Sequence, residues 1–283
     1  MSAVAVQRNR PRRSVLASVW AFVKRNVLTV YSILFFIYLM LPIAVVVVFS
    51  FNNPVGKFNY TWQGFTWNNW RYWNGVPGIQ SAITLSLEIA LIASLVATAL
   101  GTMIALALVR YRFRTRAATN ILIFLPLSTP EIVLGASLLT LFLNVTFFPF
   151  GFWTILIAHV MFCISFAVVT VKARLIGFDR HLEEAAMDLG ANEFTTFRKV
   201  TLPLIAPAIL SGLLLSFALS VDDFVVTYFN AGSEVTFPLF VWGAAQRGVP
   251  PQVNVMGTVI FVVALGLMLI NVLVQRRREG VPA

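Results

Sequence analysis

The sequence predicts an all-α membrane protein with six transmembrane helices. Hydrophobic residues make up 59% of its 283 residues, and the mean hydropathy is +0.84. Charged residues make up only 11%, against about 25% in a typical soluble domain. The apolar residues are gathered into long runs with basic residues at their ends, which is the pattern of membrane spans and their flanks.

Six apolar runs are each long enough to cross a bilayer. Each holds roughly 20 residues or more, and a helix that rises about 1.5 Å per residue then crosses a hydrocarbon core of about 30 Å. We expect the spans at 27–51, 79–109, 119–145, 150–171, 204–229 and 253–274. They form one membrane domain over residues 27–274.

The two ends of the chain are basic. Residues 1–26 precede the first span, and their stretch 14–23 is mildly amphipathic, as in a helix on a membrane surface. Arg12-Arg13 could suggest a twin-arginine export signal. The following apolar run is too long for a cleaved signal peptide and no small-residue cleavage site follows it, so we expect an uncleaved first span. Residues 275–283 form a short tail.

The connections between the spans also carry signals. Pro126 and Pro130 interrupt the third span and predict a kink. The loop 52–78 is rich in aromatic residues, which favours an interfacial belt with a small packed cap. A contact surface for an external binding protein, or a vestibule that attracts cations, is the alternative. The loop after the fifth span contains Pro250-Pro251 and several glycines, and we expect irregular structure there.

The distribution of basic residues predicts the orientation. Eighteen of the 21 lysines and arginines lie at the two termini and in the loops 110–118 and 172–203. The other three are Lys57, Arg71 and Arg247. The positive-inside rule therefore places both termini and the loop 172–203 in the cytoplasm. The same distribution argues against nucleic acid as the partner of the net charge of +10.

The stretch 179–203 is the longest polar interval between apolar runs, and it predicts two short helices joined by a turn. Asp179 can cap the first helix, whose apolar positions are helically spaced, and Gly190 suits a left-handed C-terminal cap. Asn192 can cap the second helix, and Pro203 is expected to end it. An ordinary loop or a DNA-binding helix-turn-helix is the alternative. The membrane context favours a docking element for a cytoplasmic partner.

The same stretch resembles the signature loop of the permeases of ABC importers. Glu184-Ala185-Ala186, three residues, Gly190, nine residues and Val200-Thr201-Leu202-Pro203 match the pattern E-A-A, x3, G, x9, I-x-L-P, except for Val in place of Ile. The resemblance implies a type I (MetI-like) permease whose coupling helices sit in a cleft of an ATP-hydrolysing subunit. Glu184, Ala185, Ala186 and Gly190 would then be the ATPase-docking residues.

Four carboxylates lie within the predicted spans, where charge is costly and usually faces a polar interior. They are Glu88, Glu131, Asp222 and Asp223. No basic residue lies within the spans to neutralise them. The adjacent aspartates would point about 100° apart on a helix, so at most one can face a pore squarely. We interpret the four as a path for a cation, with packing or protonation as the alternative, which is equally favoured for Glu88.

Two further stretches resemble the second permease subunit of spermidine/putrescine importers. They are the segment 219–227, which contains Asp222-Asp223-Phe224, and Pro130-Glu131-Ile132-Val133 in the third span. The resemblance implies inward transport of polyamines across a bacterial inner membrane. It also implies a homologous permease, two ATP-binding subunits that hold ATP and Mg, and an extracytoplasmic solute-binding protein. An organophosphonate or ferric iron is the alternative substrate.

The sequence argues against a catalytic role for this chain. It has no G-x-x-x-x-G-K-[ST] phosphate loop and no paired acid and base with a nucleophile. Cys163 is its single cysteine, and His159 and His181 lie far apart without other ligands, so we expect neither a disulfide nor a metal site. We expect no cofactor in the chain. A membrane enzyme or regulator is the less favoured reading.

Overall fold

The computed structural model describes residues 15–145 and 149–279, and the regular secondary structure of this part of the chain is helix, with one isolated β-bridge between Asn52 and Phe65. The all-α class is therefore confirmed. The longer helices are α1 (Val15–Phe49), α3 (Ile79–Arg110), α4 (Arg116–Ser128), α5 (Glu131–Asn144), α6 (Phe152–Ile176), α9 (Leu202–Asp222), α11 (Phe237–Arg247) and α12 (Pro251–Glu279). The short ones are α2 (Asn68–Arg71), α7 (His181–Asp188), α8 (Glu193–Thr196) and α10 (Val225–Asn230).

All six predicted spans fall on helices, but they differ in length. Among the described residues, four helical segments are long and apolar enough to cross a membrane: Asn26–Phe49, Ile79–Arg110, Phe152–Ile176 and Glu193–Asp222. The bent pair α4 and α5 makes five if it counts as one span. The sixth predicted span lies on α12, in which Pro251–Gly266 is an apolar helical segment.

The core is formed where α3, α6 and α9 pack together, and small residues allow the close approach. A Cβ on Gly101 of α3 would lie 2.7 Å from the Cβ of Ala167 on α6. A Cβ on Gly212 of α9 would lie 3.6 Å from the Cα of the same alanine. Because hydrophobicity does not drive helices together inside lipid, such tight backbone packing is a main source of their association. Ala167 is therefore the meeting point of three helices.

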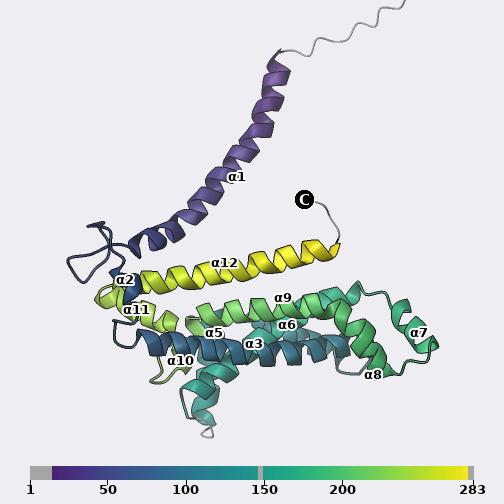
Figure 1. Ribbon diagram of the computed structural model, residues 1–283. Helices are drawn as coiled ribbons and strands as arrows, with labels where there is room; N and C mark the ends of the chain where they lie inside the picture. Colours follow the sequence, from purple (N-terminus) through teal and green to yellow (C-terminus); the bar gives the residue numbers. More distant parts are fainter. Residues whose placement is uncertain (1–14, 146–148, 280–283) are drawn as a thin grey trace, which may run out of the picture.

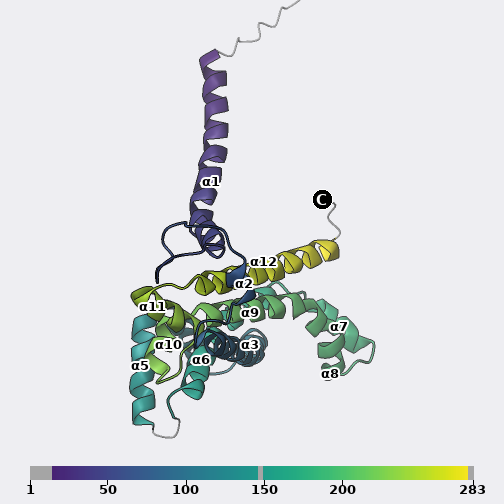
Figure 2. The same ribbon diagram turned by 60° about the vertical axis from the view of Figure 1, so that its left-hand side comes forward.

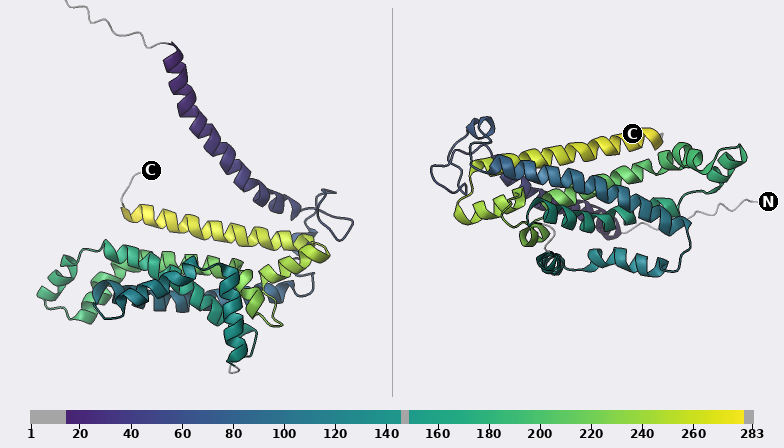
Figure 3. Two further views of the ribbon diagram at one scale, coloured as in Figure 1. Left: turned by 180° about the vertical axis from the view of Figure 1, so that it is seen from behind. Right: turned by 90° about the horizontal axis from the view of Figure 1, so that it is seen from below.

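Helix α1 stands apart from this bundle (Figure 3). It runs without interruption from Val15 to Phe49, so the predicted surface segment 14–23 continues into the first span from residue 15 onward. Its apolar window is 0% buried. It meets the rest of the molecule through α12, where a Cβ on Gly257 would lie 3.5 Å from Val46. The predictions for residues 1–14, and for residues 146–148 between the third and fourth spans, lie outside the described residues.

The third predicted span is broken rather than gently kinked. Helices α4 and α5 meet at 111°, which corresponds to a broken span or a re-entrant loop. Thr129 between them is extended, with ψ of 132°, because a residue before proline is disfavoured in the helical region. Pro130 has no N–H to continue the ladder of α4. Figure 2 shows α5 running across the direction of α3 and α6.

The fifth predicted span is wrong at both ends. Helix α9 stops at Asp222, not at Phe229, because Asp223 turns extended with ψ of 121°. Pro203 does not end the preceding helix either. Residues Phe197–Thr201 form a π-helical turn that joins α8 to α9, and Pro203 lies in the first turn of α9, where its missing N–H is tolerated.

The two predicted external loops have more structure than irregular chain. In the first, Phe51 stacks on Phe65 and Trp70, and Asn52 donates to Asn59, so the predicted packed cap is confirmed. In the second, α11 is a regular helix with Pro238 in its first turn, which corrects the expectation of irregular structure. Helices α2 and α11 lie at one end of the bundle, and α7 and α8 lie at the other (Figure 1).

Candidate functional site

The adjacent aspartates sit at the break between α9 and α10, and their environments differ. Asp222 is the last residue of α9 and is exposed. Asp223 is outside the helix, and its side chain is only 6% exposed. The predicted 100° separation on one helix is therefore wrong, because Asp223 has left helical geometry. A carboxylate that bonds nearby backbone N–H groups competes with helix continuation and favours such a break.

Asp223 is held by a network of buried polar groups. Its Oδ2 accepts hydrogen bonds from the backbone N–H and the Oγ1 of Thr227, at 2.8 and 2.7 Å. Nε2 of His159 lies 3.3 Å from the same oxygen. His159 also contacts Ser220 Oγ through Nδ1, at 2.7 Å, and Thr227 Oγ1 through Nε2, at 2.9 Å. Asp223 is thus fully engaged within this chain, and Asp222 is the aspartate that stays available.

His159 corrects the expectation that the spans contain no basic partner for these acids. It is a residue of α6, it is 3% exposed, and it lies next to Asp223 across the helix interface. The sequence interpretation set it aside because it has no neighbouring metal ligand. A polar ring inside an apolar span was the available signal, since such residues normally find a partner within the bundle.

Glu131 lies near the same break. It is exposed at the first turn of α5, and its charge, like that of Asp223, acts on Asp222. Helix α5 reaches α10 by close contact at Gly135, where a Cβ would lie 2.8 Å from the ring of Phe229. Asn230 Nδ2 donates to the carbonyl oxygen of Gly135 at 3.4 Å. Two breaks, one after α4 and one after α9, therefore bring Glu131 and Asp222 into one region.

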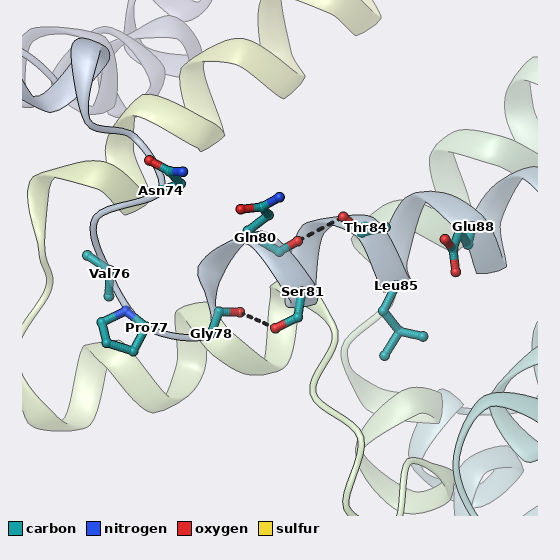
Figure 4. A pocket seen from close by; sticks show the side chains of 9 residues that line it. All are labelled: Asn74, Val76, Pro77, Gly78, Gln80, Ser81, Thr84, Leu85 and Glu88. Carbon is teal, nitrogen blue, oxygen red and sulfur yellow. Dashed lines mark hydrogen bonds between the residues drawn. The ribbon is translucent and has the colours of Figure 1, made fainter.

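Glu88 occupies a different place, on α3. It is exposed and lines an open pocket of about 560 Å³. The other lining residues are Gln80, Ser81, Thr84 and Leu85 of the same helix and Asn74, Val76, Pro77 and Gly78 before it. Figure 4 shows these mostly polar side chains along the start of α3. The structure therefore associates Glu88 with the start of α3, and not with the break at Asp222.

The two helices of the loop 179–203 present an apolar surface outward. Leu189 and Phe194 are 90% and 71% exposed, and Leu182 and Met187 are also exposed. Glu184 and Ala185 are exposed and Ala186 is partly exposed. Gly190 has φ of +88°, and its Cβ position would be free of contacts, so the predicted left-handed cap is confirmed. Asn192 caps α8 through Thr195 N–H, at 2.8 Å, as expected.

The first of these helices is preceded by a hydrogen-bonded contact between Asp179 and His181. Asp179 Oδ1 accepts hydrogen bonds from the N–H of His181, at 3.0 Å, and contacts its Nδ1, at 2.7 Å. The hydrogen bond from His181 lowers the pKa of Asp179, and the same bond raises the pKa of His181. Asp179 thus binds the first N–H of the helix, but the helix starts at His181 and the residue at its cap position is Arg180, so the predicted cap is one residue off.

Within residues 15–145 and 149–279, no group of three or more His, Cys, Asp or Glu side chains could hold a metal ion. Cys163 is buried, and its Sγ donates to the carbonyl oxygen of Ser216 at 3.4 Å. The arrangement offers two kinds of interaction. Free carboxylates at the helix breaks can attract cations, and the exposed apolar surface at the far end of the bundle can contact another protein.

Comparison with known proteins identifies the family. Residues 97–279 match the model of the family described as "Binding-protein-dependent transport system inner membrane component". The chain belongs to this permease family. The "Spermidine/putrescine transport system permease protein PotC" of Haemophilus influenzae is 43% identical over 244 residues, which cover 86% of this chain and 93% of that protein. The "Putrescine transport system permease protein PotI" of Escherichia coli is 39% identical over 236 residues, which cover 80% of this chain and 82% of that protein.

Solved structures support the same permease fold. A bacterial ABC transporter "involved in the import of the acidic polysaccharide alginate" aligns with a TM-score of 0.65 at 15% identity, over 92% of this permease and 99% of that chain. The MetNI methionine ABC transporter aligns with a TM-score of 0.57 at 16% identity, over 70% of this permease and 95% of that chain. At such identities the likeness concerns the fold alone. The matched residues 97–279 contain the signature loop, Glu131 and both aspartates.

The sequence interpretation also missed the inner side of the signature loop. Glu183, directly before the signature glutamate of this permease, is buried and pairs with Arg110. The pair joins residues 73 positions apart. The one available signal was that two glutamates in succession on a short helix must point in different directions.

Proposed function

We propose that this chain is the transmembrane permease subunit of an ATP-driven importer that carries polyamines such as spermidine and putrescine inward across the bacterial inner membrane. It would pair with a homologous permease, dock two ATP-binding subunits at its cytoplasmic face, and receive substrate from an extracytoplasmic binding protein. The curated relatives named for spermidine/putrescine and putrescine transport support the substrate class. An alginate transporter "in complex with alginate pentasaccharide-bound periplasmic protein" shares the fold and supports the partner type.

The observation that carries the substrate proposal is the exposed Asp222 at the break after α9. Asp223 beside it is occupied by Thr227 and His159, whereas Asp222 is open and lies within electrostatic range of Glu131. A polyamine carries several ammonium groups, each of which loses hydration inside a membrane. Carboxylates spaced along the path would replace that hydration, and a charge at such depth is costly unless it serves a ligand or a partner. Glu88 would contribute at the start of α3.

The docking proposal rests on the surface of α7 and α8. Exposed apolar side chains at Leu189 and Phe194, next to small residues at Ala185 and Ala186, suit burial in a cleft of another protein. ATP and Mg would be held by that partner, and this chain would hydrolyse nothing. The positive-inside distribution of lysine and arginine supports a cytoplasmic position for this loop and for both termini.

The test is the ATPase activity of the complex reconstituted with its binding protein. Spermidine, putrescine, an organophosphonate and ferric iron are supplied separately. Stimulation by a polyamine alone is the expected result. Stimulation by the phosphonate alone would keep the importer assignment and overturn the cation path at Asp222, Glu131 and Glu88. Absence of any co-purifying ATPase would overturn the importer assignment itself.

A further inference from the structure

The loop that carries the proposed docking surface is tied to the membrane bundle by three polar side chains from three different elements. Glu183 comes from α7, Arg110 is the last residue of α3, and Thr201 closes the π-helical turn before α9. Oε1 of Glu183 accepts hydrogen bonds from both Arg110 Nη2 and Thr201 Oγ1. Arg110 Nη2 also lies 3.5 Å from Thr201 Oγ1, so each of the three contacts the other two.

The cluster is shielded from solvent. Thr201 is 0% exposed, and the side chains of Glu183 and Arg110 are 12% and 27% exposed. Burial strengthens the interaction between the charges and makes an unpaired member costly, so the three groups are held in one arrangement. A second contact, from Arg180 Nη2 to the carbonyl oxygen of Val109 at 3.3 Å, ties the start of α7 to the same end of α3.

The two consecutive glutamates of α7 therefore have opposite surroundings. Glu184 is exposed on the outward surface, and Glu183 is directed into the bundle. The fixed residues of the signature pattern do not include Arg110 or Glu183, and Thr201 stands at a position of the pattern that any residue can occupy. The tie is thus a feature of the tertiary structure, and the signature itself does not account for it.

The position of this cluster determines how a movement of α7 can reach the membrane helices. The π-helical turn at Phe197–Thr201 interrupts regular α-helix between α8 and α9, where the N–H of Leu202 bonds to the carbonyl oxygen of Phe197. Such turns are rare and often mark sites where a helix adjusts. A displacement of α7 would reach α9 through this compliant turn along the backbone. It would reach α3 only through side chains, because no short backbone connection joins α7 to α3.

We infer that Arg110, Glu183 and Thr201 form the link that converts movement of α7 into joint movement of α3 and α9, the helices that carry Glu88 and Asp222. These are positioning residues: they touch neither substrate nor nucleotide. The inference rests on the proposed function, since it assumes that a partner ATPase moves α7. It predicts that weakening the link separates ATP hydrolysis from transport without releasing the partner.

The experiment measures two quantities on the reconstituted complex with spermidine-loaded binding protein: the ATPase rate, and the amount of spermidine taken up per ATP hydrolysed. Glu183→Gln removes the charge and keeps the shape, and Thr201→Val removes only the hydroxyl group. We expect both variants to retain the ATPase subunit and basal hydrolysis. Uptake per ATP should fall about tenfold in Glu183→Gln, within the usual range of coupling between two sites, and less in Thr201→Val. The control Arg112→Gln removes an exposed charge near the same helix end and should change neither quantity.

Exchange of the charges, Arg110→Glu with Glu183→Arg, should restore uptake per ATP toward that of the unaltered chain. An unchanged ratio in Glu183→Gln would overturn the inference. Loss of the ATPase subunit from that variant would also overturn it, because Glu183 would then act in docking or folding. Failure of the charge exchange to restore the ratio would overturn it as well. The proposed function would fail separately, if the unaltered chain retained no ATPase subunit or if spermidine stimulated nothing.

Discussion

Nε2 of His159, on α6, lies 3.3 Å from Oδ2 of Asp223, at the break between α9 and α10. Both side chains are almost fully buried, and Thr227 contacts both of them. This contact fixes the end of the fifth span, because it holds Asp223 outside the helix and leaves Asp222 free. The pairing explains how two adjacent aspartates can serve different purposes.

Loss of the imidazole should destabilise the permease. His159→Ala leaves Ser220 Oγ without its partner and removes the buried imidazole next to Asp223, which keeps its bonds to Thr227, and we expect a loss of about 3 kcal/mol in the free energy of unfolding. Thermal unfolding of the purified protein in detergent measures this. His181→Ala is the control, since the side chain of His181 is 87% exposed, and it should change stability by less than about 0.5 kcal/mol. Equal effects in the two variants would contradict the network.

Substitution of Asp222 and of Asp223 should affect different properties, uptake in the first case and stability in the second. Asp222→Asn is expected to reduce polyamine uptake by about tenfold or more at unchanged melting temperature, because it removes a free carboxylate from the path. Asp223→Asn should lower the melting temperature, because the carboxylate accepts from Thr227 N–H and Oγ1 and lies beside His159. Uptake and thermal unfolding are measured on the same preparations. If Asp222→Asn transports normally, the proposed role of that residue is wrong.

The close approach of α3 and α6 should not tolerate a methyl group. In Gly101→Ala the new Cβ would meet the Cβ of Ala167 at 2.7 Å and the backbone nitrogen of Val168 at 3.1 Å. Because a backbone atom cannot swing away, we expect a loss of about 1–3 kcal/mol, measured by thermal unfolding. Gly243→Ala is the matched control in α11, with nothing within 4 Å, and it should be neutral or slightly stabilising. A neutral Gly101→Ala would contradict the packing.

The contact between Asp179 and His181 should depend on pH. The pKa of His181 is raised above 6.5, so its contribution is present at lower pH and is lost as pH rises through the raised value. The pKa of Asp179 is lowered below 3.8, so its contribution is lost only as pH falls through that lowered value. The contact between the two side chains is therefore strongest between about pH 4 and 6.5. Histidine NMR titration should show the His181 pKa falling in Asp179→Asn, while a pKa that does not move would contradict the contact.

The docking surface should be sensitive to a bulky basic side chain. Glu184→Lys or Gly190→Arg is expected to release the ATPase subunit, because each alters the exposed surface of α7 or the turn that follows it. Co-purification in detergent measures the loss. Glu234→Lys is the control, since it makes the same charge change at an exposed position between α10 and α11. Retention of the ATPase by both loop variants would show that the partner binds elsewhere.

Much of the fold followed from local pattern. Apolar runs of spanning length, the caps at Gly190 and Asn192, and the spacing of the signature loop are properties of neighbouring residues, and the structure reproduces them. The errors lay where a tertiary contact overrides local preference. Helix α9 ends seven residues before the predicted end of its span because Asp223 bonds Thr227 and lies next to His159. Pro203 does not end the helix, because a π-helical turn precedes it and the proline lies in the first turn of α9.

The sequence by itself determined that this is a helical membrane protein of the permease family with a signature loop, because hydropathy and spacing are encoded along the chain. Only the tertiary structure decided which of two adjacent aspartates is free, which of two adjacent glutamates faces inward, and where the fifth span breaks. Each of those outcomes depends on a partner far away in the sequence: His159 for Asp223, and Arg110 for Glu183. Buried polar groups must find partners wherever the packing brings them, and the linear sequence does not state where that is.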